Sequence, residues 1–366
     1  MFKLGKGTRP KWGGTSVTII AMTPAYNEAD FIGATVNALK AQTIPPDRII
    51  VIANNCTDNT AMIAKEHGAE VIDLPVCEGR KAGALNTALE QILPTLDDDD
   101  YVFVQDADTL LVPDFFRLAF ECMAADPKVV ICGRYAAHYS RNPLIILQRN
   151  EFARDGRMTT RRFEKTHILV GTSSMFPVYI LRAVVQAREQ GRIPGHGYVY
   201  DPESVTEDFR LTLDLKTIGY RTMSPNGAEA ITAAMPTLPM LWKQRIRWMR
   251  GGIEDLRLYG HTKVTRGFHL RRAYIMFGFV SFLLFVATFT ASVLMQRTLQ
   301  ISMPWVILTS IFVVARVVEV RKAGRLNMII AAMLLPEIFY NIFHQAVFIT
   351  AWFKSLGQKP AAWHET

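Results

Sequence analysis

The stretch YVFVQDADT, residues 101–109, joins an apolar run to two aspartates that are one residue apart. Residues 101–105 have the length and the β-branched and aromatic content of a buried strand. Asp106 and Asp108 follow directly, and side chains at i and i+2 of an extended segment point the same way. Two such carboxylates repel each other unless a cation lies between them. The stretch therefore predicts a divalent-metal site at a strand end, with a polar turn as the alternative.

Strand-like and helix-like segments alternate on the N-terminal side of this stretch. Expected strands cover residues 17–22, 49–53, 70–74 and 101–105, and expected helices cover residues 29–42, 59–68 and 81–93. The alternation predicts an α/β fold with a Rossmann-like, mostly parallel sheet and flanking helices. Ligands of such sheets bind beyond the carboxyl ends of the strands. The polar residues 23–28, 54–58 and 106–108 follow three of the strands, so they predict one shared nucleotide-type site.

The apolar residues of the 366-residue chain concentrate after Arg272. Residues 273–295 carry no charge, and a helix of this length can cross a hydrocarbon core of about 30 Å. Residues 299–320 and 328–353 are two further candidate spans. The last of these carries Glu337, Asn341 and His344 on one helical face, so this face should contact protein or a polar cavity rather than lipid.

The net charge of +8 raises the question of a nucleic-acid partner. Eight basic residues, however, lie shortly before the first predicted span: Arg245, Arg247, Arg250, Arg257, Lys263, Arg266, Arg271 and Arg272. Basic residues beside a span are typical of the cytoplasmic side of a membrane. We therefore expect a lipid bilayer and no nucleic acid as partner. The expected location is integral and multi-pass in the plasma or inner membrane, with the N-terminal domain in the cytoplasm.

Six motifs, in this order, resemble the signature of family 2 glycosyltransferases of GT-A fold. They are TPAYNE (residues 23–28), NNCTDNT (54–60), RKAGALN (80–86), QDADT (105–109), TED (206–208) and QRIRW (244–248). The resemblance covers about residues 17–250 and is to the membrane-embedded branch that includes cellulose, chitin and hyaluronan synthases. It implies an enzyme, namely a metal-dependent, inverting hexosyltransferase that uses a UDP-sugar as donor.

The resemblance implies a set of donor-binding residues, namely Ala25, Glu28, Asp58, Lys81 and Asp106. The carboxylates of Glu28 and Asp58 can accept hydrogen bonds from a base and a ribose. For Asp58, capping of the helix that follows is an alternative compatible with this role. Lys81 opens a helix, so that its ammonium and the free N–H groups can face phosphates; the alternative is a solvated surface lysine.

The same resemblance assigns the metal and the base. Asp108 is the more direct ligand of Mg²⁺ or Mn²⁺, and Asp106 assists in the metal and nucleotide site. Asp208 in TED matches the family's general base, which takes the proton of the acceptor hydroxyl. Glu207 either binds the acceptor or orients the loop. The alternative for TED is an N-cap, because a helix-like run follows Thr206.

Two further segments are assigned to the acceptor. Gly171 and Thr172 belong to a loop of small residues, GTSSMF, that resembles the acceptor side of the family's site. Gln244, Arg245, Arg247 and Trp248 form the motif associated with processive enzymes, in which tryptophan stacks on a sugar while glutamine and arginine hold phosphates and the acceptor end. Apolar residues on one side of the same segment are also typical of an interfacial helix, and the two interpretations are compatible. These residues are Leu238, Leu241, Trp242 and Met249.

The predicted organisation follows from these motifs and spans. Residues 1–16 are an N-terminal tail, 17–235 the GT-A catalytic domain, 236–272 interfacial helices, 273–353 about three transmembrane helices, and 354–366 a C-terminal tail. The predicted function is processive extension of a polysaccharide at the membrane. The alternatives are transfer of a single sugar to a lipid or protein acceptor, and a non-catalytic membrane protein that retains a nucleotide pocket. Three spans are few for an export channel, so export would require a homo-oligomer or another protein.

Overall fold

The computed structural model describes residues 11–12, 15–296 and 303–357. They belong to two compact units, of which the first contains Met1–Tyr139 and Asp155–Ala234 and the second contains Ser140–Arg154 and Met235–Thr366. Most of both predicted tails, and residues 299–302 at the start of the second predicted span, lie outside the described residues.

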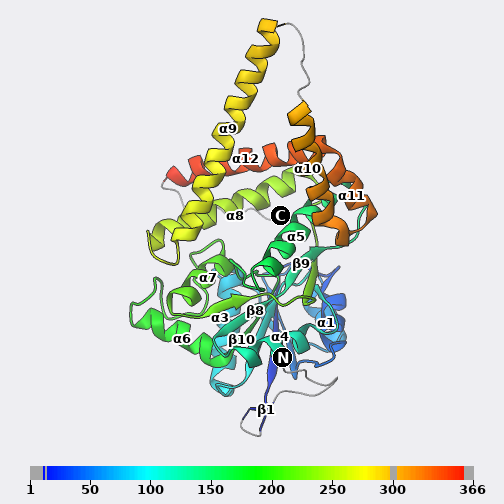
Figure 1. The fold of residues 1–366 in the computed structure, drawn as a ribbon. Helices are drawn as coiled ribbons and strands as arrows, with labels where there is room; N and C mark the ends of the chain where they lie inside the picture. Colours follow the sequence, from blue (N-terminus) through cyan, green and yellow to red (C-terminus); the bar gives the residue numbers. More distant parts are fainter. Residues whose placement is uncertain (1–10, 13–14, 297–302, 358–366) are drawn as a thin grey trace. The chain divides into compact units, whose positions relative to one another are not determined.

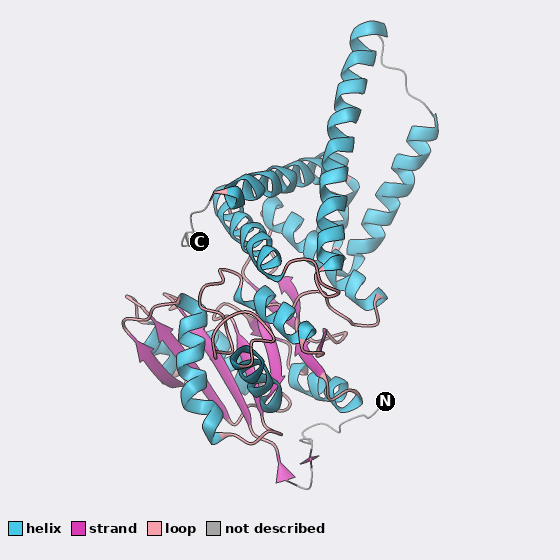
Figure 2. Ribbon diagram, turned by 90° about the vertical axis from the view of Figure 1, so that its left-hand side faces the viewer, coloured by secondary structure: helices cyan, strands magenta, loops and turns pink. Residues whose placement is uncertain are grey.

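A seven-stranded sheet forms the centre of the first unit (Figures 1 and 2). Its strand order is β11-β8-β10-β6-β3-β4-β5, and every neighbouring pair is parallel except the two pairs that β10 makes with β6 and β8. The strands are β3 (Ile19–Ala25), β4 (Arg48–Asn54), β5 (Glu70–Leu74), β6 (Tyr101–Gln105), β8 (Val129–Cys132), β10 (Ser173–Pro177) and β11 (Arg221–Met223). The predicted α/β domain with a mostly parallel sheet is confirmed.

Helices cover both faces of this sheet, because consecutive residues of the central strands are apolar and point alternately to one face and the other. Ile20 and Val102 enter one hydrophobic core, whereas their chain neighbours Ile19 and Phe103 enter the other. The first core is covered by α3 (Arg80–Ile92), α6 (Val178–Glu189) and α7 (Glu207–Thr217). The second is covered by α1 (Ile32–Lys40), α2 (Thr60–Glu66) and α4 (Phe115–Ala125).

The sequence predicted the bounds of β5 and β6 correctly, but it ended β3 too early. Residues 23 and 24, threonine and proline, resemble a break, yet β4 pairs with β3 as far as Ala25. β6 pairs with β3 only as far as Met22, so the side of β3 that faces β6 needs no donor from Pro24. Parallel β3, β4 and β6 thus end at one edge of the sheet, where the polar segments follow.

A small second sheet lies beside the end of β6. It has the order β7-β12-β9, formed by β7 (Leu110–Leu111), β12 (Glu229–Thr232) and β9 (Arg134–Ala137). Because β7 follows the two aspartates immediately, its pairing with β12 brings a distant part of the chain next to them.

The second unit is helical. Its elements are α8 (Leu238–Tyr259), α9 (Arg266–Gln296), α10 (Met303–Val320), α11 (Arg325–Ala332), α12 (Leu334–Leu356) and the part of α5 (Pro143–Arg161) that ends at Arg154. α8 and α12 pack side by side (Figure 1). Leu241 and Tyr340 belong to the small core between them, and the rings of Trp242 and Phe343 meet edge to face at 5.6 Å.

Among the described residues, α9 is the one helix long and apolar enough to cross a membrane. The pair α11 and α12, bent by 81°, makes a second candidate only if it is counted as one broken span. The prediction of about three spans is therefore not supported. The expectation for the polar face of the last candidate is confirmed for Glu337, which is buried and pairs with Arg154 at 2.9 Å.

Candidate functional site

The two aspartates after β6 have different partners. Asp106 accepts a hydrogen bond from Lys81, with 2.5 Å between Nζ and Oδ1, and its backbone N–H donates to the carbonyl oxygen of Thr172. Asp108 instead accepts from two hydroxyl groups, those of Thr109 and Thr232, each 3.2 Å from Oδ1. Thr232 belongs to β12 and is a site residue that the sequence analysis missed, since only the pairing of β12 with β7 brings it here.

Acidic side chains from the ends of β3 and β6 influence each other. Burial, and next the charge of Asp106, raise the pKa of Asp108. Burial, followed by the charges of Asp108, Asp106 and Asp58, raises the pKa of Glu28 to about 7. This edge of the sheet therefore concentrates negative charge that a cation would neutralise.

Asp106 and Asp108 fit a divalent cation by their donor chemistry. Both supply hard carboxylate oxygens, and the raised pKa of Asp108 reflects first its burial and next the negative charge of Asp106. Over the described ranges, no group of three or more His, Cys, Asp or Glu side chains is arranged to enclose an ion. The set suits a metal such as Mg²⁺, which is commonly held by one or two carboxylates and completes its shell with phosphate oxygens and water.

Lys81 is placed by a tight turn before α3. Gly79 has a left-handed φ of 77°, and a Cβ on Gly83 would lie 2.0 Å from the carbonyl oxygen of Glu78, so the turn requires glycine at both positions. The ammonium of Lys81 lies between Asp106 and Glu207, 3.1 Å from the latter. Burial favours the neutral amine, but these carboxylates outweigh it and raise the pKa of Lys81. Lys81 is thus a charged residue of the site and not a solvated surface lysine.

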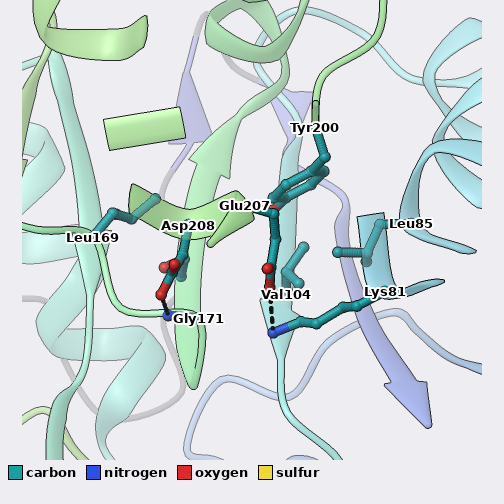
Figure 3. A pocket seen from close by; sticks show the side chains of 9 residues that line it. Lys81, Leu85, Val104, Leu169, Gly171, Tyr200, Glu207 and Asp208 are labelled. Atoms are coloured by element: carbon teal, nitrogen blue, oxygen red, sulfur yellow. Dashed lines mark hydrogen bonds and ion pairs between the residues drawn. The ribbon is translucent and has the colours of Figure 1, made fainter. Parts of the chain in front are cut away.

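Asp208 lies in the first turn of α7 and is oriented by two backbone donors, of which Figure 3 shows the one from Gly171. The N–H of Gly171 donates to Oδ2 at 3.0 Å, and the N–H of Phe209 donates to Oδ1 at 2.7 Å. A Cβ at position 171 would lie 3.0 Å from Nζ of Lys81 and 3.3 Å from Oδ2 of Asp208, so a side chain there would disturb both groups. Gly171 is thus a donor to the predicted base as well as a small residue.

The electrostatic surroundings of Asp208 favour its protonated form. Burial, and then the charge of Glu207, raise its pKa to about 6, although Lys81 and the two backbone donors act in the opposite direction. A carboxylate whose pKa lies close to neutrality is suited to accept a proton during a reaction. The N-cap alternative for this motif is weakened, because Thr206 makes no side-chain capping hydrogen bond.

Hydrogen bonds from a side chain of α3 hold the loop that precedes α7. Asn86 exchanges two hydrogen bonds with the backbone of Tyr200, at 2.7 and 3.0 Å, and the buried pair of Arg210 and Asp201 lies at 2.6 Å. Tyr200 lines, together with Lys81 and Asp208, a cavity of about 10 Å³ (Figure 3). Asn86 belongs to the RKAGALN motif of the sequence. Its role in fixing this loop could not be predicted, because its partner Tyr200 lies 114 residues further along the chain.

On the donor side, Asp58 bridges two loops. Oδ1 accepts from the backbone N–H of Thr60 at 3.0 Å, and Oδ2 accepts from that of Ala29 at 3.1 Å. Slight burial raises the pKa of Asp58, but hydrogen bonds from the hydroxyl of Thr60 and then from the two backbone N–H groups lower it below its ordinary value, so the exposed carboxylate remains charged. Asp58 thus accepts the N–H of Thr60, the first residue of α2, while the N-cap position is Asn59, which makes no side-chain capping hydrogen bond. Ala25, the last residue of β3, is buried beside this loop.

The remaining candidates, Gln244, Arg245, Arg247 and Trp248, lie on α8 in the second unit. Arg245 has a protein partner in the structure, and its predicted role in holding a ligand stays a prediction. It is only 4% exposed and pairs with Glu151 at 2.8 Å, and its guanidinium lies 4.5 Å from the centre of the Trp248 ring. Leu241 and Trp242, assigned to an interfacial apolar side, pack within the unit instead.

Direct contacts therefore link five predicted residues of the first unit: Lys81, Asp106, Gly171, Glu207 and Asp208. The backbone of Thr172 joins them through Asp106, and its buried hydroxyl has no hydrogen-bond partner among the described residues. Such an arrangement can hold an anionic ligand by Lys81 and accept a proton at Asp208.

Comparisons with known proteins identify a family domain and relatives of this chain. Glycosyl transferase family 2 matches residues 20–185. Poly-beta-1,6-N-acetyl-D-glucosamine synthase of Staphylococcus aureus (strain MSSA476) is 30% identical over 269 residues, which are 69% of this chain and 59% of that protein. The synthase of Staphylococcus epidermidis is 28% identical over 238 residues, 63% of this chain and 53% of the relative. The chain thus spans less than two thirds of the length of these relatives.

Among solved structures, the mannosyltransferase PcManGT from Pyrobaculum calidifontis, in complex with GDP-Man and Mn²⁺, has a TM-score of 0.57 and 19% identity. The alignment covers 93% of this chain and 87% of the mannosyltransferase, so the two share a fold. Residues 20–185 of this chain thus form a domain of glycosyltransferase family 2.

Proposed function

We propose that this protein is an inverting, metal-dependent glycosyltransferase that extends a polysaccharide from a UDP-sugar at a membrane. The observation that carries the proposal is the placement of Asp208. Two backbone N–H groups orient its carboxylate, its pKa is raised to about 6, and Gly171 joins it to the site of Lys81. A base and a phosphate-binding cation lie within one small site, as transfer from a sugar nucleotide requires.

In the proposed reaction, an acceptor hydroxyl attacks the anomeric carbon of the donor sugar. A new C–O bond forms as the bond between that carbon and the diphosphate oxygen breaks, and the proton of the hydroxyl passes to Oδ2 or Oδ1 of Asp208. The nucleoside diphosphate leaves on the opposite face, which inverts the anomeric configuration. Lys81 stabilises the charge that develops on the leaving group.

Asp106 and Asp108 are the residues that would hold a divalent cation. When bound, such a cation supplies Lewis-acid neutralisation of the diphosphate. Lys81, by contrast, already pairs with Asp106, so it orients this carboxylate. Glu28 and the exposed carboxylate of Asp58 are proposed to accept hydrogen bonds from the base and ribose.

For the sugar, we take the names of the relatives as the guide. The two staphylococcal proteins are named as synthases of poly-β-1,6-N-acetyl-D-glucosamine. We therefore propose N-acetylglucosamine as the donor sugar and a β-1,6-linked polymer as the product. The glycan is held by Trp248, whose indole is 37% exposed, and by Gln244 and Arg247 of the same helix.

A membrane location is part of the proposal. It rests on α9, which carries no charge from Ala273 onward and is preceded by basic residues, as is typical of the cytoplasmic end of a span. The catalytic unit would then be cytoplasmic, and export of the polymer would require a homo-oligomer or another protein. Protease accessibility in sealed inverted vesicles tests this orientation, since the catalytic unit should be cleaved without detergent.

The decisive experiment is incubation of the purified full chain with a panel of labelled UDP-sugars and Mg²⁺ or Mn²⁺, followed by sizing of the product. We expect consumption of UDP-N-acetylglucosamine above the other donors and products of many sugars. Consumption with one sugar added per acceptor would replace the polymerase by the single-transfer alternative. No turnover of any donor with either metal, by folded protein, would overturn the proposed function.

A further inference from the structure

Glu151 of α5 organises a buried polar cluster in the second unit. Its Oε2 accepts hydrogen bonds from Nη2 of Arg245 at 2.8 Å and from the hydroxyl of Tyr340 at 2.7 Å. Nε2 of His344 lies 3.7 Å from the same oxygen, and its ring meets that of Tyr340 edge to face. One carboxylate oxygen thus joins α5, α8 and α12.

Arg245 connects this cluster to the exposed tryptophan. The two residues are three apart on α8, so their side chains lie on the same face of the helix. The guanidinium carbon lies 4.5 Å from the ring centre of Trp248, which is a cation–π distance. Arg245 is 4% exposed, whereas Trp248 is 37% exposed, so a buried cation supports an aromatic ring that reaches the surface.

We propose that Arg245 is a positioning residue for Trp248: held by Glu151, its guanidinium fixes the indole in the orientation that grips the growing glycan. This inference rests on the proposed role of Trp248 in holding the product. In this proposal Arg245 acts on the glycan through the indole, because its Nη2 donates to Glu151 and its guanidinium lies against the ring of Trp248. The contribution of Arg245 to product length therefore passes entirely through the tryptophan.

The physical reason is the freedom of a surface indole. An exposed tryptophan on a helix can adopt several rotamers, and only one of them presents its face to a sugar in a given pose. Stacking by a guanidinium restricts that freedom, and Glu151 keeps the guanidinium from rotating away. Lysine at position 245 retains the charge but lacks the planar group that covers an indole.

The test is a double-mutant cycle read out as product length. Arg245→Gln, Arg245→Lys, Trp248→Ala and the double variant Arg245→Gln/Trp248→Ala are compared with the parent at matched amounts of folded protein. Arg250→Gln is the matched control, because Arg250 lies on the same helix and pairs with Glu254 at 2.6 Å. Thermal unfolding of each variant separates loss of fold from loss of grip.

We expect Arg245→Gln to shorten the mean product roughly two- to fivefold, the range that a cation–π contact corresponds to. Arg245→Lys should lie between this variant and the parent, and Arg250→Gln should give parental length. The double variant should match Trp248→Ala, since without the indole there is nothing for Arg245 to position. Arg245→Lys keeps the test valid if the glutamine variant fails to fold.

Two results would overturn the inference while the proposed function stands. One is parental product length in both Arg245 variants alongside shortened product in Trp248→Ala. The other is additive shortening in the double variant, which would mean that Arg245 acts by another route. Parental length in Trp248→Ala would instead remove the proposed grip of Trp248, and the inference with it.

Discussion

Two half-buried carboxylates, Asp208 in the first unit and Glu151 in the second, have opposite protonation behaviour. Burial raises the pKa of both. For Asp208 the next influence is another acid, Glu207, and its pKa rises to about 6. For Glu151 the next influence is the buried cation Arg245, and with the hydroxyl of Tyr340 it lowers the pKa below its ordinary value.

The difference shows that the neighbours of a carboxylate, rather than its burial alone, decide what it can do. Asp208 can exchange a proton near neutral pH and is therefore suited to chemistry. Glu151 remains an anion over the working range and is suited to anchoring other side chains. Substitutions can distinguish the two sites, because replacing Asp208 should remove proton transfer and replacing Glu151 should remove the anchoring of other side chains.

The largest effect is expected for Asp208→Asn. An amide of the same shape cannot accept the acceptor's proton, so kcat should fall by roughly 10²- to 10⁴-fold. UDP binding should remain within a few-fold of the parent, because a base acts on the acceptor. Calorimetric titration with UDP and a turnover assay measure the two quantities on the same preparation. A parallel collapse of UDP affinity would show that Asp208 serves the donor and not the acceptor.

Asp108→Asn should reduce metal-dependent turnover by more than about 100-fold while the fold is kept. Thr232 can still donate its hydroxyl to the remaining amide oxygen, so we expect no large change in melting temperature. Turnover is measured over a range of Mn²⁺ concentrations, and Thr109→Val serves as a matched loss of one hydrogen bond to Asp108. Near-parental activity at ordinary Mn²⁺ would contradict the metal role.

For Glu151, which anchors other side chains, the expected effect of substitution is on the stability of the protein. Glu151→Ala leaves the buried guanidinium of Arg245 without its carboxylate, which should lower the free energy of unfolding by about 3 kcal/mol. Glu254→Ala removes the partner of Arg250, an ion pair nearer to solvent, and should cost less than about 1 kcal/mol. Denaturant unfolding in detergent compares the two. Equal losses would show that the Glu151 cluster is no more than a surface pair.

The smallest effect is a pH dependence that affects only one of the two sites. Because the pKa of Asp208 is about 6, kcat at saturating donor should fall tenfold per pH unit below this value, as the base becomes protonated. The pKa of Glu151 is depressed, so its stabilising contribution is present above its ordinary pKa and is lost only at still lower pH. Activity should therefore decline between pH 6 and 5, whereas the difference in melting temperature between the parent and Glu151→Ala should stay constant over this range.

Glu28 provides the control for this profile. Its pKa of about 7 puts its titration in the same range, but its proposed role is in donor binding. Glu28→Gln should change the pH dependence of the KM for the donor and leave the decline of kcat in place. A kcat profile that becomes flat in this variant would assign the titration to Glu28.

Local pattern was sufficient for much of the first unit. β5 and β6 have the bounds that the sequence predicts, and Lys81, Asp106 and Asp208 are indeed linked in one site. Prediction failed where a long-range partner outweighed a local signal. Strand β3 continues through Pro24 because β4 pairs with it, and Trp242 faces Phe343 rather than an interface. Of the three expected spans, the described residues retain α9 and, if the pair bent by 81° is counted as one span, α11 with α12.

The sequence by itself determined the α/β architecture and the chemistry of the strand ends, because a period of two, turn glycines and carboxylates at i and i+2 are properties of neighbouring residues. The tertiary structure alone decided which partners these groups have. Thr232 is 124 residues from Asp108, Gly171 is 37 from Asp208, and Arg245 is 94 from Glu151. The pKa of each carboxylate follows from such partners, because Coulomb interactions and desolvation depend on distance in space and not on separation along the chain.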